Sequence, residues 1–479
     1  MCTVVPIMAL TTVNVVLPQL QGMLSATPDQ ISWVITLYVV GAAVATPVGG
    51  WLVARYGWRS VMLITVIGFG ISTALCATAT SLVPLLVYRA LQGAFGAPMM
   101  PVAQAILLAT YPDEDRAWSQ AVFGLVTVVG QAMAPVIGGY FAEAFDWRWA
   151  FLFLIPLSVA AVAMTLIWIP HGGKVIGARL DWPGFLALSI AIVGLQLTID
   201  QGERLDWFES RQIIAYALVA VVGLYVFVLR TLSYHEPYIN PILFRDRNFL
   251  IGLVLIFLFG MLNFVPMILL PTLLSNLKGY PESSIGWLLG MRGIGMFIGF
   301  YIGGKFAATR PKVILIFGFL VVGISGAETA SFDLNVQFNE VAWVSFLQGM
   351  GIGTLWVPIV MVTFATLSPS LLAQGSAINH LIRHLGTSIF VALSVSVVVR
   401  TGAISYTELS AHITPYNKAL QGAETWSIEA VADLARLSQE IDRQAQMIGY
   451  LNAFVLYTAV SGAALLISCL IKFRPTNEP

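Results

Sequence analysis

Long apolar segments recur along the whole chain, and they constrain its fold more than any other feature. A helix needs about 20 apolar residues to cross the roughly 30 Å hydrocarbon core of a bilayer. Fourteen runs of about this length lie near 1–18, 31–52, 60–79, 82–108, 118–141, 149–169, 183–200, 212–230, 248–274, 284–303, 313–331, 341–366, 374–399 and 448–471. The sequence therefore predicts an all-α, polytopic membrane protein with 14 transmembrane helices.

The composition agrees with a membrane protein and excludes other classes. Of the 479 residues, 58% are hydrophobic and 10% are charged, whereas an ordinary soluble chain carries about 25% charged residues. The formal net charge is zero, so nothing indicates nucleic acid as a partner. Three cysteines in apolar runs suggest neither a disulfide framework nor a metal site. The chain starts directly in an apolar run, without an evident signal peptide, and this abrupt start suggests that a short N-terminal arm is missing.

The positions of lysine and arginine in the short loops predict the orientation. With the N-terminus inside, the cytoplasmic side carries Arg55, Arg59, Arg116, Lys174, Arg179, Arg245, Arg247, Lys305, Arg310, Lys312, Lys472 and Arg474. The outer short loops carry only Arg148, Arg204, Arg211 and Lys278. An even number of helices then returns the C-terminus to the cytoplasm.

One predicted outer connection, residues 401–447, is long and polar. Within it, 426–446 places Ile428, Val431 and Leu434 at helical spacing, with charges between them. Two interpretations stay open. The segment is either a solvated helix lying on the membrane surface or a docking surface for a partner outside the membrane.

Two short sequences recur in the same order in both halves of the chain. LQG occurs at 91–93 and again at 347–349, and GGWLVARYGWR at 49–59 has a faint counterpart in GGKFAATRPK at 303–312. Both echoes have a spacing of 254 to 256 residues. Internal repeats that share a midplane site are typical of secondary transporters.

Several charged and polar residues fall inside apolar runs. Arg89 and Gln92 lie in VYRALQGAFGAPMMP (87–101), although an arginine at the centre of a spanning helix costs about 2.5–3.5 kcal/mol. The alternative for Arg89 is an anchor close enough to the outer surface to snorkel. Arg292 also lies well within its run. Such residues mark transport pathways.

A second group surrounds Arg383. His380 and His384 are four residues apart, so they share a helical face, and histidine titrates near neutral pH. Each histidine alone is equally interpretable as a structural hydrogen-bonding residue. The acidic residues Asp200 and Glu328 fall near the outer ends of their helices, and we interpret them as interfacial.

On these features the chain resembles the major facilitator superfamily, specifically its fourteen-spanner drug:proton antiporters of the EmrB/QacA type and, most closely, EmrB-like subunits. Helix four matches the L-x-x-x-R-x-x-Q-G motif, and helix thirteen carries the Asn379, Arg383 and Gly386 element. The matching residues elsewhere are Gly50, Arg55, Gly57 and Arg59 in the loop after helix two, and Gly130, Pro135, Gly138 and Gly139 in the antiporter signature of helix five.

This resemblance implies a fold and a function. The fold is a six-helix bundle (1–170), two inserted helices (171–247) and a second six-helix bundle (248–479), with a central cavity between the bundles. The candidate cavity residues are Asn14, Tyr38, Gln131 and Asn263. The implied function is export of a lipophilic small molecule across a bacterial inner membrane, driven by protons, without cofactor or metal. EmrB-type subunits also work with a periplasmic adaptor (a membrane fusion protein) and an outer-membrane channel.

The chain departs from this family at three positions and leaves alternatives open. Ala9 occupies the place of the usual first-helix aspartate, Ala54 replaces a common loop aspartate, and Ala134 replaces one glycine of the antiporter signature. Coupling is therefore expected to depend on His380, Arg383 and His384. The alternatives are a dedicated exporter of one metabolite (fatty acid, siderophore or antibiotic), or a channel, receptor or scaffold. No motif indicates an enzyme. The stretch GFYIGGK (299–305) is similar to a phosphate-binding loop, but Phe306 follows it where that motif requires serine or threonine.

Overall fold

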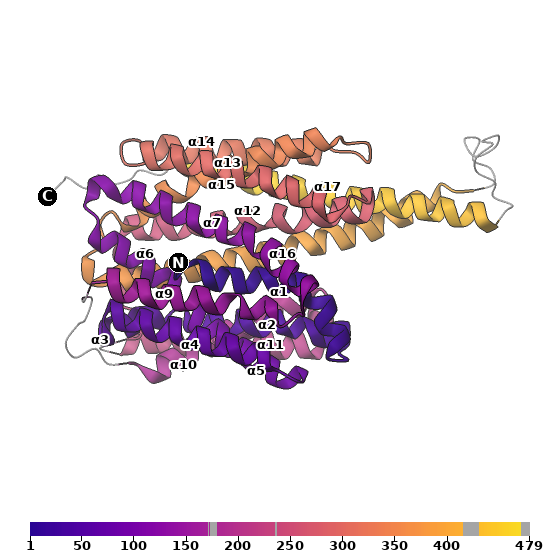
Figure 1. Ribbon diagram of the computed structural model, residues 1–479. Coiled ribbons are helices and arrows are strands. Elements are labelled where there is room, and N and C mark those ends of the chain that lie inside the picture. The colour runs from indigo at the N-terminus through magenta and orange to yellow at the C-terminus, as the bar shows by residue number, and fades with distance from the viewer. Residues whose placement is uncertain (171, 173–179, 235–236, 415–430, 471–479) are drawn as a thin grey trace.

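The computed structural model describes residues 1–170, 172, 180–234, 237–414 and 431–470, and its regular elements there are all helices. Most of the long helices run side by side, and one pair projects beyond the others (Figure 1). The described residues contain no β-strand. The all-α prediction is confirmed.

The first half of the chain forms nine helices: α1 (Val4–Met23), α2 (Pro28–Ala45), α3 (Val48–Tyr56), α4 (Trp58–Thr78), α5 (Leu82–Gly96), α6 (Met99–Thr110), α7 (Asp113–Ala144), α8 (Trp149–Leu152) and α9 (Leu154–Trp168). Two helices, α10 (Trp182–Gly202) and α11 (Arg211–Ser233), follow as a pair. Helix α10 packs on α2 in the first half and on α16 in the second.

The second half contains α12 (Arg247–Lys278), α13 (Glu282–Phe306), α14 (Pro311–Ala330), α15 (Phe338–Phe364), α16 (Leu372–Ala411) and α17 (Val431–Leu470). Short 3-10 helices are η1 (Trp207–Glu209), η2 (Pro241–Arg245) and η3 (Pro369–Leu371). These six helices pack mainly on one another, as α1–α9 do in the first half.

Each predicted apolar run coincides with a helix or a pair of consecutive helices. Among the described residues, eleven helices are long and apolar enough to span a membrane, and the bent pair α2–α3 makes a twelfth. The other two predicted spans, 1–18 and 118–141, coincide with α1 and α7, parts of which are not described at side-chain level. The count of fourteen crossings stays a prediction.

Two runs predicted as single helices are interrupted at prolines. The run 31–52 divides into α2 and α3 at Pro47, with a bend of 50°, and 82–108 divides into α5 and α6 at Pro98. Proline has no N–H to donate and its ring clashes with the preceding turn. The two interruptions pack together, since a Cβ on Gly49 would lie 3.3 Å from the Pro98 Cβ.

Close glycine contacts occur at matching positions in the two halves. A Cβ on any of four helical glycines would overlap a backbone carbonyl oxygen of the neighbouring helix. The matching contacts are Gly41–Ala90 with Gly295–Phe346, and Gly93–Tyr38 with Gly349–Arg292. Each residue lies 254 or 256 positions before its counterpart, which is the spacing of the sequence echoes. This match supports a duplicated half.

We expect Gly93→Ala and Gly349→Ala each to destabilise the protein by about 1–3 kcal/mol, the usual cost of overpacking. The obstacle is a backbone carbonyl, which cannot rotate away as a side chain can. Gly293→Ala is the matched control, because a Cβ there meets nothing within 4 Å. Thermal unfolding in detergent measures the effect. Equal midpoints for Gly93→Ala and the control would contradict the tight α2–α5 contact.

The described residues of the predicted outer loop 401–447 are largely helical, which corrects the description of these parts as a loop. Helix α16 continues to Ala411, and α17 begins at Val431, so the pair projects beyond the bundle (Figure 1). The Tyr406 and Ser438 hydroxyls lie 3.1 Å apart and link the two helices. Ion pairs such as Arg443–Glu440 support the extension. The helical spacing predicted over 426–446 therefore corresponds, from Val431 onward, to the start of α17. Residues 426–430 lie outside the described residues.

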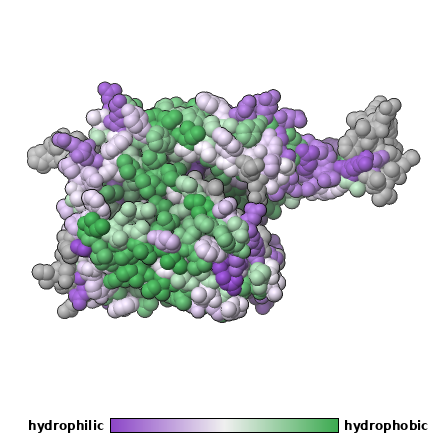
Figure 2. Space-filling model, in the orientation of Figure 1, coloured by the Kyte–Doolittle hydropathy of each residue, from purple (hydrophilic) through white to green (hydrophobic). Residues whose placement is uncertain are grey.

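The surface separates into apolar and polar parts. Hydrophobic side chains gather over the middle of the visible face, and hydrophilic ones cover the described part of the projecting α16–α17 pair (Figure 2). An apolar band of this kind is the surface that lipid covers. The projecting pair, called the outer hairpin below (residues 400–411 and 431–447), is suited to water.

Candidate functional site

A cavity of about 130 Å³ lies between the two halves. Its apolar wall comes from the first half and includes Ile7, Leu10 and Val39. Its polar wall comes from α10 and α16 and consists of Gln196, His380, His384 and Ser388. Tyr38, a predicted cavity residue, lines it as well. The cavity is therefore amphipathic, with no carboxylate among its described lining residues.

The halves touch at the end of the bundle where α3, α6 and the start of α16 lie, called the closed end below. A Cβ on Gly50 of α3 would lie only 2.8 Å from the Gln374 Cα of α16. Gln374 is itself fixed, since its Nε2 donates to the Tyr238 carbonyl at 2.7 Å. Gly50, predicted from the loop motif, thus lets the two halves approach closely.

A buried polar network joins the halves between the closed end and the cavity. The Ser376 hydroxyl donates to Gln104 Oε1 at 2.7 Å, and His380 Nε2 lies 3.0 Å from the same oxygen. Gln104 Nε2 donates to Gln120 Oε1 at 3.4 Å. All four side chains are at most 1% exposed. We call these residues the interbundle network.

Our sequence reasoning found His380 but missed the other members of this network. Gln104, Gln120 and Ser376 are uncharged, so a search for charges inside apolar runs passes over them. Buried glutamines in predicted spans are the signal that was available. Their pairing across α6, α7 and α16 depends on the packing of the two halves.

The hydrogen bonds define the protonation of the two histidines. Because Gln104 Oε1 can only accept, His380 carries its proton on Nε2 and offers Nδ1 to Arg383 Nη2, 3.4 Å away. His384 Nε2 accepts from the same nitrogen at 3.2 Å. Both rings are neutral in this arrangement. A second proton on either ring would place an imidazolium against the guanidinium, so it would displace Arg383.

Arg89 is fully buried, which excludes a snorkelling anchor. Its Nε donates to the Val34 carbonyl at 3.2 Å, and its Nη1 donates to the Ala9 carbonyl at 3.4 Å and to Gln92 Oε1 at 2.5 Å. The guanidinium carbon lies 4.3 Å from the centre of the Tyr38 ring. Arg89 therefore joins α1, α2 and α5 through dipoles and a ring face, without an ion pair to any described residue.

Arg292 has a corresponding environment in the second half. Its Nε donates to Gln348 Oε1, and its Nη2 donates to both the backbone and side-chain oxygens of Asn263 at 2.8 Å. Gln92 and Gln348 are the glutamines of the two LQG sequences, so in each half this glutamine accepts a hydrogen bond from a buried arginine.

Three residues predicted to line the cavity lie elsewhere or are not described. Asn263 binds Arg292 and is not among the lining residues of the cavity. Gln131 donates to the Met267 sulfur at 3.2 Å, where α7 meets α12. The Asn14 side chain lies outside the described part of the structure.

The residues of the antiporter signature lie where α7 packs on α1. A Cβ on Gly130 would lie 2.6 Å from a Val4 methyl, and one on Gly138 would overlap the Thr12 side chain. Gly139 follows in the same helix, and the Pro135 side chain lies outside the described part. The described contacts are therefore those of close helix packing.

The loop motif forms the turn between α3 and α4. Gly57 has a φ of 84°, which favours glycine, and it separates the two helices. Arg55 is exposed at the end of α3, whereas Arg59 Nη2 donates to the Leu166 carbonyl at 2.6 Å.

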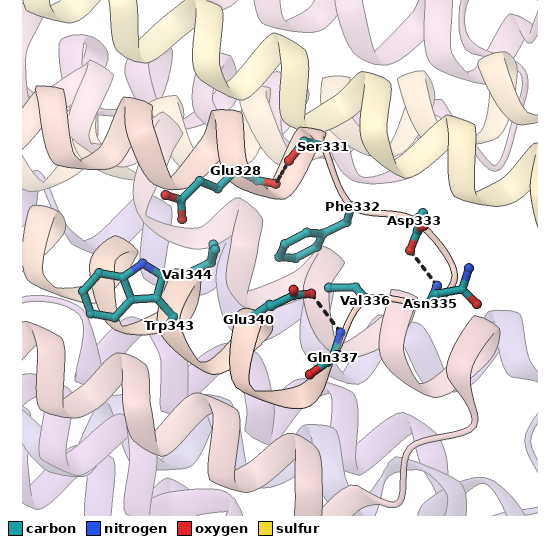
Figure 3. A pocket seen from close by; sticks show the side chains of 10 residues that line it. All are labelled: Glu328, Ser331, Phe332, Asp333, Asn335, Val336, Gln337, Glu340, Trp343 and Val344. Carbon is teal, nitrogen blue, oxygen red and sulfur yellow. Dashed lines mark hydrogen bonds between the residues drawn. The ribbon is translucent and has the colours of Figure 1, made fainter.

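A separate groove of about 520 Å³ lies at the turn between α14 and α15 (Figure 3). Glu328 borders it near the end of its helix. Glu340 accepts from the Gln337 N–H at 3.0 Å and caps α15, while Asp333 accepts from the Asn335 N–H at 2.7 Å. These polar groups organise the turn between the two helices.

The two matching halves, the amphipathic cavity between them and the buried arginines define a membrane transporter. The family model of the Major Facilitator Superfamily matches residues 1–391, and the chain belongs to that superfamily. It is accordingly a transporter and not an enzyme.

Individual relatives show which transporters within the superfamily the chain is similar to. The chain is 31% identical over 424 residues to the multidrug export protein EmrB of Escherichia coli K12, covering 88% of this chain and 83% of the relative. It is 29% identical to the fatty acid resistance protein FarB of Neisseria gonorrhoeae, covering 92% and 86%. The resemblance to EmrB-type transporters is confirmed.

Solved structures agree on the fold. The proton:xylose symporter XylE superposes with a TM-score of 0.60 at 13% identity, covering 99% of this chain and 95% of that one. The human organic anion transporter MFSD10 gives a TM-score of 0.58 at 14% identity, with 96% and 97% covered.

Proposed function

We propose that the protein is a multidrug efflux transporter that exports lipophilic or amphipathic small molecules in exchange for protons. The observation that carries this proposal is the cavity, which opposes an apolar wall of the first half to a polar wall formed by α10 and α16. The similarity to EmrB supports export of drugs.

Alternating access follows from the same geometry. The closed end seals one side of the cavity through Gly50, Gln374 and the interbundle network. We place the closed end on the cytoplasmic side of a bacterial inner membrane, with both termini cytoplasmic, because the lysines and arginines of the short loops favour that orientation. Opening this end would admit the compound, and closing it would release the compound outside.

Coupling to protons is assigned to His380, Arg383 and His384. Protonation of either ring requires Arg383 to move, and His380 also touches the interbundle network. A proton on this group would therefore act on the contact between the halves. Arg89 cannot exchange the proton itself, since arginine stays charged in proteins.

Transport in proteoliposomes tests the proposal. Ethidium and oleate are assayed separately, each with and without an imposed pH gradient. A probe that the protein exports should accumulate only when the gradient is present. Counterflow without a gradient separates a carrier from a channel. Absence of gradient-driven accumulation for both probes would contradict the proposed function.

A dedicated exporter of one acidic amphiphile is the second candidate. The described lining of the cavity holds no carboxylate, and the FarB relative is named for fatty acid resistance. Accumulation of oleate without any transport of ethidium would favour this narrower function.

The outer hairpin is proposed to bind a periplasmic adaptor that leads to an outer-membrane channel. Its exposed apolar side chains, Ile404 and Leu434, lie on helices that project beyond the bundle. Deleting 405–444 should abolish drug resistance in cells that rely on such an assembly. Transport in proteoliposomes should continue, because the deletion leaves the cavity intact. Full resistance with the adaptor present would contradict the docking role.

A further inference from the structure

A polar seam runs between the inserted helix α10 and α16, from the cavity toward the end opposite the closed end. It begins at Gln196 and Ser388, which both line the cavity. Gln196 Nε2 donates to Ser388 Oγ at 3.3 Å and to Asp200 Oδ1 at 2.8 Å. One carboxylate is therefore bonded directly to a residue of the cavity wall.

The seam continues one turn farther along α10. Glu203 accepts from the Ser396 hydroxyl of α16 and, at 2.7 Å, from Trp207 Nε1. Gln196 and Asp200 belong to α10, and Glu203 is its C-cap residue with helical backbone angles. Their spacing of i, i+4 and i+7 places all three on one face. Ser388 and Ser396 are two turns apart on α16 and follow the same direction.

Exposure varies along this face. Gln196 is 5% exposed, Glu203 is half-buried and Asp200 is exposed. Neither carboxylate forms an ion pair with a described residue. At the inner end, His380 and His384 of α16 line the cavity and lie beside Arg383, and His384 is one turn from Ser388. Asp200 is thus bonded to the cavity wall through Gln196 while its side chain stays exposed, and Glu203 lies one turn farther out.

The first helix has Ala9 at the position where the related antiporters usually carry an aspartate. The carboxylates of the seam therefore stand out as an alternative proton carrier. We propose that the inserted helix α10 supplies the proton path, with Glu203 and Asp200 carrying protons from the outer surface to the cavity. The inference rests on the proposed proton-coupled export. It gives the inserted helix a part in coupling, beyond joining the two halves.

The proton balance is simple. Hydronium in outer water protonates a seam carboxylate, and the resulting acid releases the proton to water in the cavity, regenerating the carboxylate. A cavity of about 130 Å³ holds several waters, since each occupies about 30 Å³. The proton then binds His384 Nε2, the lone pair that now accepts from Arg383 Nη2. Arg383 is displaced, and the imidazolium carries the proton until the cavity faces the other side.

Chemical labelling tests the path without any transported compound. Dicyclohexylcarbodiimide reacts with protonated carboxyl groups in apolar surroundings. In reconstituted wild-type protein at mildly acidic pH, peptide mass spectrometry should find the adduct on Asp200. Glu209, an exposed carboxylate of η1 without a bond to α16, is the internal control. Labelling of Asp200 no greater than that of Glu209 would overturn the proposal.

Isosteric variants test the coupling. Asp200→Asn and Glu203→Gln keep the hydrogen-bond acceptors for Gln196, Ser396 and Trp207 but cannot titrate. The double variant should lose gradient-driven accumulation of ethidium or oleate by about tenfold or more. Counterflow of the same probe should stay within about twofold of wild type, as expected when positioned proton transfer alone is lost.

The remaining outcomes are distinguishable. Glu209→Gln should behave as wild type. Equal loss of counterflow and gradient-driven transport in the double variant would indicate a structural role and overturn the proposal, as would unchanged gradient-driven transport. Failure of the wild type itself to accumulate either probe would instead contradict the proposed function, while the labelling result would stand separately.

Discussion

Replacing Arg89 with lysine is expected to leave a protein that inserts in the membrane but loses most of its proton-driven export. Arg89 donates to the carbonyls of Ala9 and Val34 and to Gln92, so it connects three helices with one planar group. Lysine has a single ammonium at the end of its chain and cannot reproduce this fork. Each charge-assisted hydrogen bond that is lost costs about 1.5–3 kcal/mol.

The experiment compares Arg89→Lys with Arg55→Lys, since Arg55 is exposed at the end of α3. Both variants keep the charge, and only the first loses the buried fork. Gradient-driven accumulation in proteoliposomes and the thermal midpoint in detergent should both fall for Arg89→Lys and stay near wild type for Arg55→Lys. Wild-type transport by the Arg89 variant would show that the positive charge alone is enough.

Much of the fold was predictable because its signals are local. Apolar runs located the long helices of the bundle, and the cost of a charge in a membrane marked Arg89 and Arg292 before any contact was known. The spacing of the echoes predicted a duplicated half, and the structure repeats contacts at that spacing, such as Gly93 with Tyr38 and Gly349 with Arg292.

The rest depends on packing between distant segments. Asn263 sits in a run that is apolar around most of its circumference, so the sequence could not tell which face meets Arg292 and which meets the cavity. The interruptions at Pro47 and Pro98 were hidden for a similar reason, because apolar residues continue on both sides of each proline. Hydropathy measures transfer into lipid and is insensitive to the path of the backbone.

Gln104 is a second case of dependence on packing, since its hydrogen bonds to Ser376 and His380 exist only while the halves are in contact. Replacing it with leucine should open the closed end. The substitution removes the acceptor of Ser376 and of His380, and these groups stay unsatisfied in the closed state but meet water when the halves separate. Two neutral hydrogen bonds are together worth about 2 kcal/mol, which corresponds to a roughly thirtyfold shift between two states.

Spin labels would measure this shift. In a variant with the native cysteines replaced by serine, Ser60→Cys and Ser370→Cys place labels on exposed positions of the two halves near the closed end. Gln104→Leu should move the distance distribution toward longer separations. Gln201→Leu is the matched control, because Gln201 is equally buried but its side chain forms no hydrogen bond to another described residue. If both variants gave the wild-type distribution, the interbundle network would not hold the halves together, and the closed end would depend on the Gly50–Gln374 contact and its neighbours alone.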